Sequence, residues 1–122
     1  MVKSNDVAKS RIGDDQRPDR KWLVHHANSV VSSELGAAIG SQTMETINFH
    51  LRLLVGVDIS HVASEPKLVE RGLRTLFGSG AWVIMEAAIL AVFRSANLIP
   101  EKDFNSLEEA IDELCSRASF SH

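Results

Sequence analysis

The sequence predicts an all-α fold: a compact bundle of four to five helices around a central apolar helix at about residues 80–97. The run from Leu76 to Phe93, LFGSGAWVIMEAAILAVF, is apolar on every helical face and contains one carboxylate, Glu86. A helix that is hydrophobic all round must be surrounded by other helices or by lipid. Elsewhere apolar residues recur at spacings of three and four, and no segment alternates with period two.

The composition is typical of one globular domain. The chain has 122 residues, of which 44% are apolar and 24% are charged, and this size supports a single hydrophobic core. The one cysteine, Cys115, cannot form an internal disulfide, so the fold must depend on packing. The chain opens without a basic leader and apolar segment, so we expect a cytoplasmic protein.

The charges are distributed unevenly along the chain. Residues 1–21 hold six Lys and Arg against four Asp, whereas residues 22–122 hold seven Lys and Arg against twelve Asp and Glu. A net-acidic body lacks the positive surface of a nucleic-acid binder. Residues 1–20 have almost no apolar periodicity, so we expect a disordered arm there and a single helical domain over 21–122.

Two helices are predicted in the first half of this domain. The first covers 22–39 and ends at Gly40, and Ser41 is a suitable N-cap for the second. The second, over 42–55, places Met44, Ile47, Leu51 and Leu54 on one face, which Phe49 and Leu53 widen enough to meet two neighbours.

A connector over 56–64 leads to a third helix, over 67–77, with Pro66 in its first turn. This helix has an apolar face made of Leu68, Val69, Leu73, Leu76 and Phe77. The glycines of 78–80 break it and begin the apolar helix of Ala81–Asn97, which ends before Pro100.

The last helix begins at a capping box, in which Ser106 and Glu109 satisfy each other's free backbone donors. Its apolar stripe consists of Leu107, Ala110, Ile111, Leu114 and Ala118. Cys115 lies on this amphipathic helix, where we expect it to be a small packed side chain.

Four residues are candidates for a functional site. A buried, unpaired Glu86 would favour its neutral form and be poised for proton chemistry. Alternatively, Glu86 pairs with an arginine or reaches the surface. Lys67, Arg71 and Arg74 form a stripe that could contact an acidic partner or a phosphate, or else a solvated face in which Glu70 pairs with Arg74.

Three other sequence features do not match known functional motifs. The FGSGA segment lacks the lysine and the preceding strand of a phosphate-binding loop, so we interpret it as a helix break. The apolar run approaches the length of a membrane span, but Glu86 near its middle disfavours one. The five histidines have no metal-ligand spacing, so no metal or cofactor is expected.

The stretch from about Leu35 to Leu98 resembles the Nitrosopumilus output domain, a small archaeal family found alone or attached to signalling modules. The similarity lies in the NFHL helix, the VGVDISHVASEP connector and LVERGLRTLFGSGAWVIMEAAI with its FG-x-GA junction. The resemblance implies a helical domain that transmits a signal through contacts with itself or another protein. It implies no catalytic residues.

We therefore predict a non-enzymatic interaction or signalling-output module that forms a homodimer through part of the apolar helix or the preceding one. One alternative is a helix-turn-helix-like DNA-binding regulator that uses the FGSG turn and the Lys67, Arg71, Arg74 stripe. Another is a small-molecule-binding domain or enzyme centred on Glu86, with His50 and Trp82.

Overall fold

The structure, a computed structural model, describes residues 20–119, and within this range it contains helices and no strand. The predicted all-α fold is confirmed. The elements in chain order are α2 (Arg20–Ile39), α3 (Ser41–Val55), η1 (Ile59–His61), α4 (Pro66–Phe77), η2 (Gly78–Gly80), α5 (Ala81–Arg94) and α6 (Leu107–Ser119). The predicted arm of residues 1–20 lies outside the described residues except for Arg20, which already belongs to α2.

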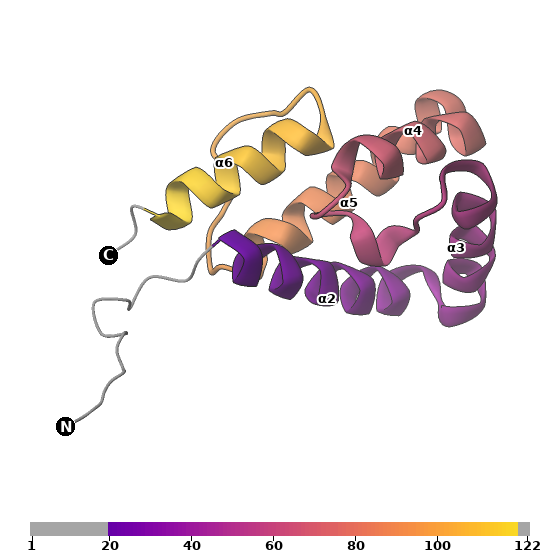
Figure 1. Ribbon diagram of the computed structural model, residues 1–122, viewed down its shortest axis with the longest axis horizontal. Helices are drawn as coiled ribbons and strands as arrows, with labels where there is room; N and C mark the ends of the chain where they lie inside the picture. The colour runs from indigo at the N-terminus through magenta and orange to yellow at the C-terminus, as the bar shows by residue number, and fades with distance from the viewer. Residues whose placement is uncertain (1–19, 120–122) are drawn as a thin grey trace.

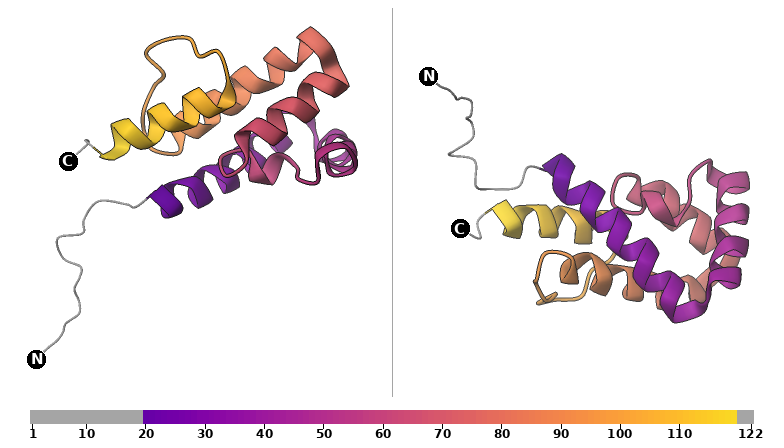
Figure 2. Two further views of the ribbon diagram at one scale, coloured as in Figure 1. Left: turned by 45° about the horizontal axis from the view of Figure 1, so that its top comes forward. Right: turned by 90° about the horizontal axis from the view of Figure 1, so that it is seen from below.

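The helices form an elongated bundle. α2 runs along its length, and α3 lies across one end (Figure 1). α4 and α5 form a hairpin, and α6 packs against both of them (Figure 2). α5 also packs against α2, so helices from the two halves of the chain share one core.

The hairpin turns at η2, where the sequence predicted a helix break. Gly78 has φ 57° and ψ −132°, a backbone conformation that residues with a Cβ rarely adopt. Its N–H donates to the carbonyl of Arg74, the last intrahelical bond of α4. Gly80 has helical angles, φ −69° and ψ −13°. Gly78 therefore supplies the change of direction that lets α5 run back beside α4.

α5 ends at Arg94, earlier than the predicted Asn97, in a left-handed cap. The N–H of Leu98 donates to the carbonyl of Phe93 at 2.9 Å, and the N–H of Asn97 donates to that of Arg94 at 3.0 Å. Asn97 has φ 59°. This pair of bonds is a Schellman motif, in which Asn replaces the more common Gly.

The start of α6 confirms the predicted cap in part. Ser106 Oγ accepts the N–H of Glu109 at 3.1 Å. The side chain of Glu109, however, accepts the N–H of Asn105 at 2.8 Å, one position before the predicted donor. A third acceptor comes from α4, because Glu70 Oε1 accepts the N–H of Leu107 at 2.9 Å.

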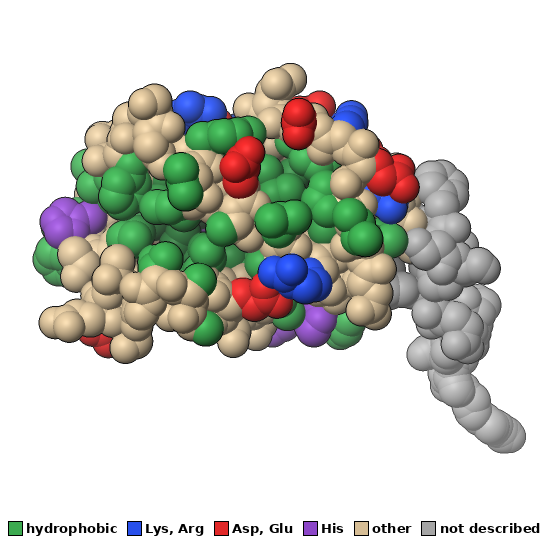
Figure 3. All heavy atoms as spheres, turned by 180° about the vertical axis from the view of Figure 1, so that it is seen from behind, with side chains coloured by type: hydrophobic (Ala, Val, Ile, Leu, Met, Phe, Trp, Pro, Cys, Tyr) green, Lys and Arg blue, Asp and Glu red, His purple; other side chains and the backbone are tan. Residues whose placement is uncertain are grey.

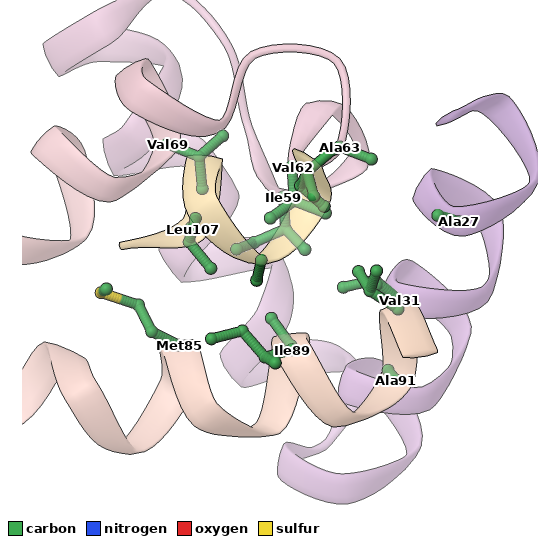
Figure 4. Close-up of a cluster of buried hydrophobic side chains, with 14 of the residues drawn as sticks. Ala27, Val31, Ile59, Val62, Ala63, Val69, Met85, Ile89, Ala91 and Leu107 are labelled. Carbon is green, nitrogen blue, oxygen red and sulfur yellow. The ribbon is translucent and has the colours of Figure 1, made fainter. Parts of the chain in front are cut away.

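The hydrophobic core is continuous and draws on every helix. Figure 4 shows Val31 of α2, Val62 of the connector, Met85 of α5 and Leu107 of α6 converging on it. The predicted apolar stripe of α6 is fully buried, and so is Cys115.

The prediction that α3 meets two neighbours is confirmed, because α3 packs against α2 and α4, but the prediction that its buried face is widened is wrong. Phe49, Leu53 and Leu54 are all exposed. Only the face with Met44, Ile47 and Leu51 is buried. The reason is geometric: α3 lies across the end of the bundle, so its outer side has no helix to pack against (Figure 1).

The connector between α3 and α4 is a fixed part of the fold. Asn28 Oδ1 of α2 accepts the N–H of Ala63 at 2.6 Å, and Asn48 Oδ1 of α3 accepts the N–H of Ile59 at 3.1 Å. Ile59 and Val62 are buried in the core. Two helices therefore hold the connector through side-chain amides, in addition to apolar contacts.

Asp58 organises the start of η1 and is the one buried charged residue among those described. Its carboxylate accepts the Ser60 N–H at 2.9 Å and the Ser60 hydroxyl at 2.6 Å, and it pairs with Arg52. Burial raises the pKa of Asp58, but the hydrogen bonds from Ser60, Arg52 and His61 outweigh burial, so the pKa lies below its ordinary value. Folding therefore stabilises the charged form of this carboxyl.

Candidate functional site

The outer side of α5 is an exposed apolar surface. Val83 is 73% exposed and Leu90 is 49% exposed, and half-buried Ala87 lies between them on the same side of the helix. The spacing of these residues places them on one helical face, together with exposed Glu86 and Arg94. We call these five residues the α5 face.

The loop after α5 extends this surface. Ile99 is 76% exposed, and Pro100 lines a cavity of about 540 Å³ together with Leu90 and Trp82. Seen from behind, the molecule shows hydrophobic side chains gathered in a broad band (Figure 3). The side of α5 that faces away from the connector is therefore apolar, and no other described helix covers it.

The structure corrects the prediction of a fully surrounded central helix. α5 buries Ala81, Met85, Ala88, Ile89, Ala91, Val92 and Phe93 against its neighbours. It lies at one side of the bundle, where α2, α4 and α6 cover its inner surface. In the right-hand view of Figure 2, α5 and the connector lie on opposite sides of the molecule. Val83, Glu86 and Leu90 are exposed because these three helices occupy only the inner side. At the end of the α5 face, Arg94 donates to Glu34 of α2 at 2.7 Å.

Glu86 is exposed, so the hypothesis of a buried functional acid is wrong. Glu86 comes three residues after Val83, so both side chains lie on the exposed side of α5. In the part of the chain that the structure describes, it has no ion pair with Arg52, Arg71 or Arg74. The alternative, in which Glu86 reaches the surface, is confirmed.

The predicted cationic stripe of α4 is largely neutralised. Lys67 Nζ lies 3.7 Å from Glu108 Oε1, and Arg74 Nε donates to Glu70 Oε2 at 2.8 Å. The Glu70–Arg74 pair was predicted from its spacing. The guanidinium of Arg74 also lies 5.9 Å from the centre of the Trp82 ring.

The three cations do line one open cavity of about 540 Å³, together with Thr75 and Ser106. The carboxylates of Glu70 and Glu108 line the same cavity. Among the described residues, Arg71 is the cation of the stripe without an ion pair. This balance of charge does not favour a strong phosphate site.

Glu70 has a structural role that the sequence did not reveal. Its side chain is only 14% exposed and holds both Arg74 and the first backbone N–H of α6. A carboxylate at a helix N-terminus interacts favourably with the helix dipole. The bond from Leu107 N–H to Glu70 depends on how α4 packs against α6. No local sequence signal encodes this bond.

The three residues of the small-molecule hypothesis do not form one site. Trp82 and Glu86 line the cavity beside the loop of 98–105. His50 lines a different cavity, of about 370 Å³, between α3 and the end of α4. The structure therefore brings together two of the three residues, and both are at the edge of the α5 face.

Cys115 is enclosed by the core, and burial raises the pKa of its thiol. A thiol in that state is a poor nucleophile. Within residues 20–119, no three His, Cys, Asp or Glu side chains are grouped to hold a metal ion.

One helical run, Pro66–Arg94, is long and apolar enough by length and composition alone to cross a membrane. The run reverses direction at η2 (Figure 2). α5 has 14 residues, or about 21 Å of helix, which is shorter than the roughly 30 Å hydrocarbon layer. In the structure these residues pack as two helices of the bundle.

Comparison with protein-family models, with curated proteins and with solved structures found no match to this chain.

Proposed function

We propose that the protein is a non-enzymatic interaction module of the cytoplasm that acts by self-association, and that the α5 face forms the interface of a homodimer. The observation behind the proposal is the exposure of Val83 and Leu90 on a helix whose other side is part of the core. Exposed apolar side chains that lie next to one another are typical of interaction surfaces. A rigid helix loses little conformational entropy on association.

A twofold-symmetric dimer suits the sequence of this face. In an isologous interface, residue i of one protomer contacts residue j of the other and the reverse contact also forms. Val83 and Leu90 flank the small side chain of Ala87, so two antiparallel copies of α5 can approach closely and place Val83 of one against Leu90 of the other. The charged residues Glu86 and Arg94 then lie toward the rim, as in most interfaces.

The interface needs more surface than α5 alone provides. A stable interface buries about 800 Å² on each partner, and a helix of this length presents only part of that area. The exposed loop around Ile99 and Pro100 lies next to Leu90 and supplies additional apolar surface. We therefore expect both α5 and this loop to be buried in the dimer.

The experiment is sedimentation velocity of the full chain over a wide concentration range, with Val83→Lys/Leu90→Lys as the variant. For the wild type we expect twice the 13.4-kDa chain mass. For the variant we expect a dimer Kd about 100-fold higher, because the apolar contact of each substituted residue is lost twice in a twofold-symmetric interface. Leu53→Lys is the matched control, since Leu53 is 69% exposed on α3, away from this face. A wild-type monomer at every concentration, or equal weakening by Leu53→Lys, would refute the proposal.

The two other functions have less support. Helix-turn-helix recognition needs an exposed, polar second helix, whereas α5 exposes Val83 and Leu90. The cations of α4 are mostly paired with carboxylates. Glu86 lies in solvent at the edge of an apolar surface, which suits an interface rim better than a ligand site.

A further inference from the structure

A groove between α2 and the connector has a chemistry that the proposed dimer does not use. It has a volume of about 590 Å³. The connector that forms one of its walls lies on the opposite side of the molecule from α5 (Figure 2). Its wall on α2 is made by Lys21, Val24, His25, Asn28, Ser29 and Ser32, and its wall on the connector is made by Ser60, His61 and Ser64.

The charge of this groove is opposite to that of the body of the protein. Its lining contains an ammonium and two imidazoles, those of Lys21, His25 and His61, and no carboxylate. Residues 22–122 are net acidic, and the cavities beside α4 and beside α5 each contain two carboxylates. The carboxylate of Asp58 lies 3.4 Å from His61 Nδ1, outside the lining, and is paired with Arg52. The lining itself therefore offers an anion donors and no carboxylate.

The side chains of Lys21 and His25 make no contact with a charged group among the described residues and can reach a ligand. Neither Lys21 nor His25 has an ion pair or hydrogen bond with any described residue. His61 uses only Nδ1 within the described part of the chain, at 3.4 Å from Asp58 Oδ1 and 3.3 Å from Ser60 Oγ. The charge of Asp58 is already engaged by Arg52 and Ser60.

The two walls are fixed relative to each other. Asn28 joins them, because its Oδ1 accepts the N–H of Ala63 at 2.6 Å and its Nδ2 donates to Ser64 Oγ at 3.2 Å. Ser29 and Ser32 add hydroxyl groups along α2. A site whose donors are already in place loses less entropy when a ligand binds.

We propose that this groove binds a sugar phosphate. Ammonium and imidazole groups are suited to the phosphate, and the hydroxyls of Ser29 and Ser32 are suited to hydroxyl groups of the sugar. The volume lies within the range of small-molecule sites and exceeds what inorganic phosphate needs. The lining holds no Phe, Tyr or Trp on which a nucleobase could stack, so a nucleotide is a poorer match.

The test is a titration of the isotope-labelled full chain with ribose 5-phosphate, followed by amide NMR shifts, with ribose and inorganic phosphate in parallel. We expect saturable amide shifts confined to residues 21–32 and 60–64. Ribose and inorganic phosphate should each bind more weakly than ribose 5-phosphate. Lys21→Gln and His25→Gln should each weaken ribose 5-phosphate binding about fivefold, the scale of one typical hydrogen bond that competes with water. Both side chains are exposed, so the fold should persist.

Lys67→Gln is the matched control, because Lys67 is an exposed lysine in the cavity that also holds carboxylates. Its affinity for ribose 5-phosphate should equal that of the wild type. Absence of saturation, shifts spread over all basic residues, or equal loss with Lys67→Gln would overturn the site. Inorganic phosphate binding as tightly as ribose 5-phosphate would overturn the assignment of a sugar. None of these outcomes depends on the oligomeric state, so this inference and the proposed dimer fail separately.

Discussion

Two glycines two positions apart are expected to respond in opposite ways to the same substitution. Gly78 adopts φ 57° and ψ −132°, a backbone conformation that residues with a Cβ rarely adopt. Gly80 has helical φ and ψ, and an added Cβ would have Phe77 Cβ as its nearest neighbour, at 3.9 Å. Gly78→Ala therefore strains the turn between α4 and α5, whereas Gly80→Ala fills open space on a helical backbone.

The magnitudes follow from the backbone alone. A residue with a Cβ held in a region normally reserved for glycine costs about 1–3 kcal/mol. Replacing a glycine of compatible conformation by alanine stabilises a protein by about 0.4–1 kcal/mol, because the unfolded chain has less entropy to lose. We therefore expect the free energies of unfolding of the two variants to differ by about 2 kcal/mol, with the wild type between them.

Urea unfolding followed by circular dichroism measures this difference, at one protein concentration so that any dimerisation is held constant. Equal m-values in the three proteins would show that the same surface is exposed on unfolding, so that the shifts in midpoint report changes in stability. A Gly78→Ala variant as stable as the wild type would refute the argument that this glycine is required for the hairpin. A destabilised Gly80→Ala variant would refute the assignment of a helical conformation at Gly80.

Two further predictions concern the carboxylates of Glu70 and Asp58, and Glu108 serves as a control. Glu70→Ala should lower the free energy of unfolding by about 1–2 kcal/mol, because the buried N–H of Leu107 loses its acceptor. Glu108→Ala removes a half-exposed carboxylate and should lower the free energy of unfolding by less than about 0.5 kcal/mol. Chemical denaturation of Glu70→Ala and Glu108→Ala measures the difference between the two. Asp58→Asn should be less stable than the wild type at pH 7, because its ion pair with Arg52 is lost. The folded pKa of Asp58 is depressed, so its contribution is fully present above the ordinary aspartate pKa of about 3.9 and is lost as the pH falls below that value through the folded pKa. The stability gap between the two proteins should therefore close on acidification, and a gap that stays constant down to pH 3 would contradict the assignment.

The helices could be predicted from the sequence because their signals are local. Ser106 is a good N-cap, Pro66 suits a first turn, and the glycines at 78 and 80 interrupt an otherwise helical pattern; each of these acts within one turn of the backbone. The structure places a helix boundary at each of them. The end of α5 was harder to locate, because the prediction relied on Pro100, whereas the helix ends earlier in a cap where Asn97 adopts the left-handed conformation more common for glycine.

Burial could not be predicted with the same accuracy, because it depends on how many neighbours each helix has. The apolar run contains Val83 and Leu90 at helical spacing, and this pattern alone does not distinguish a core face from an exposed one. The same ambiguity affected Phe49 and Leu53 on α3. The buried network of Asp58 was missed for a different reason: its partner Arg52 belongs to another element, and only the short Asp58–Ser60 spacing is visible locally.

The exposure of Val83 and Leu90 on α5, which the sequence did not predict, is also the basis of the proposed function. A chain of this size could have buried Val83 and Leu90 by adding another helix, but its remaining helix, α6, packs on the inner side of the hairpin. Exposing apolar side chains on the most hydrophobic helix makes the monomer prone to association, so a second copy that covers them would stabilise the fold as well as serve a function. For this reason the dimer should show a higher melting temperature at higher protein concentration, by mass action. The Val83→Lys/Leu90→Lys variant should lose that dependence while keeping its helical content.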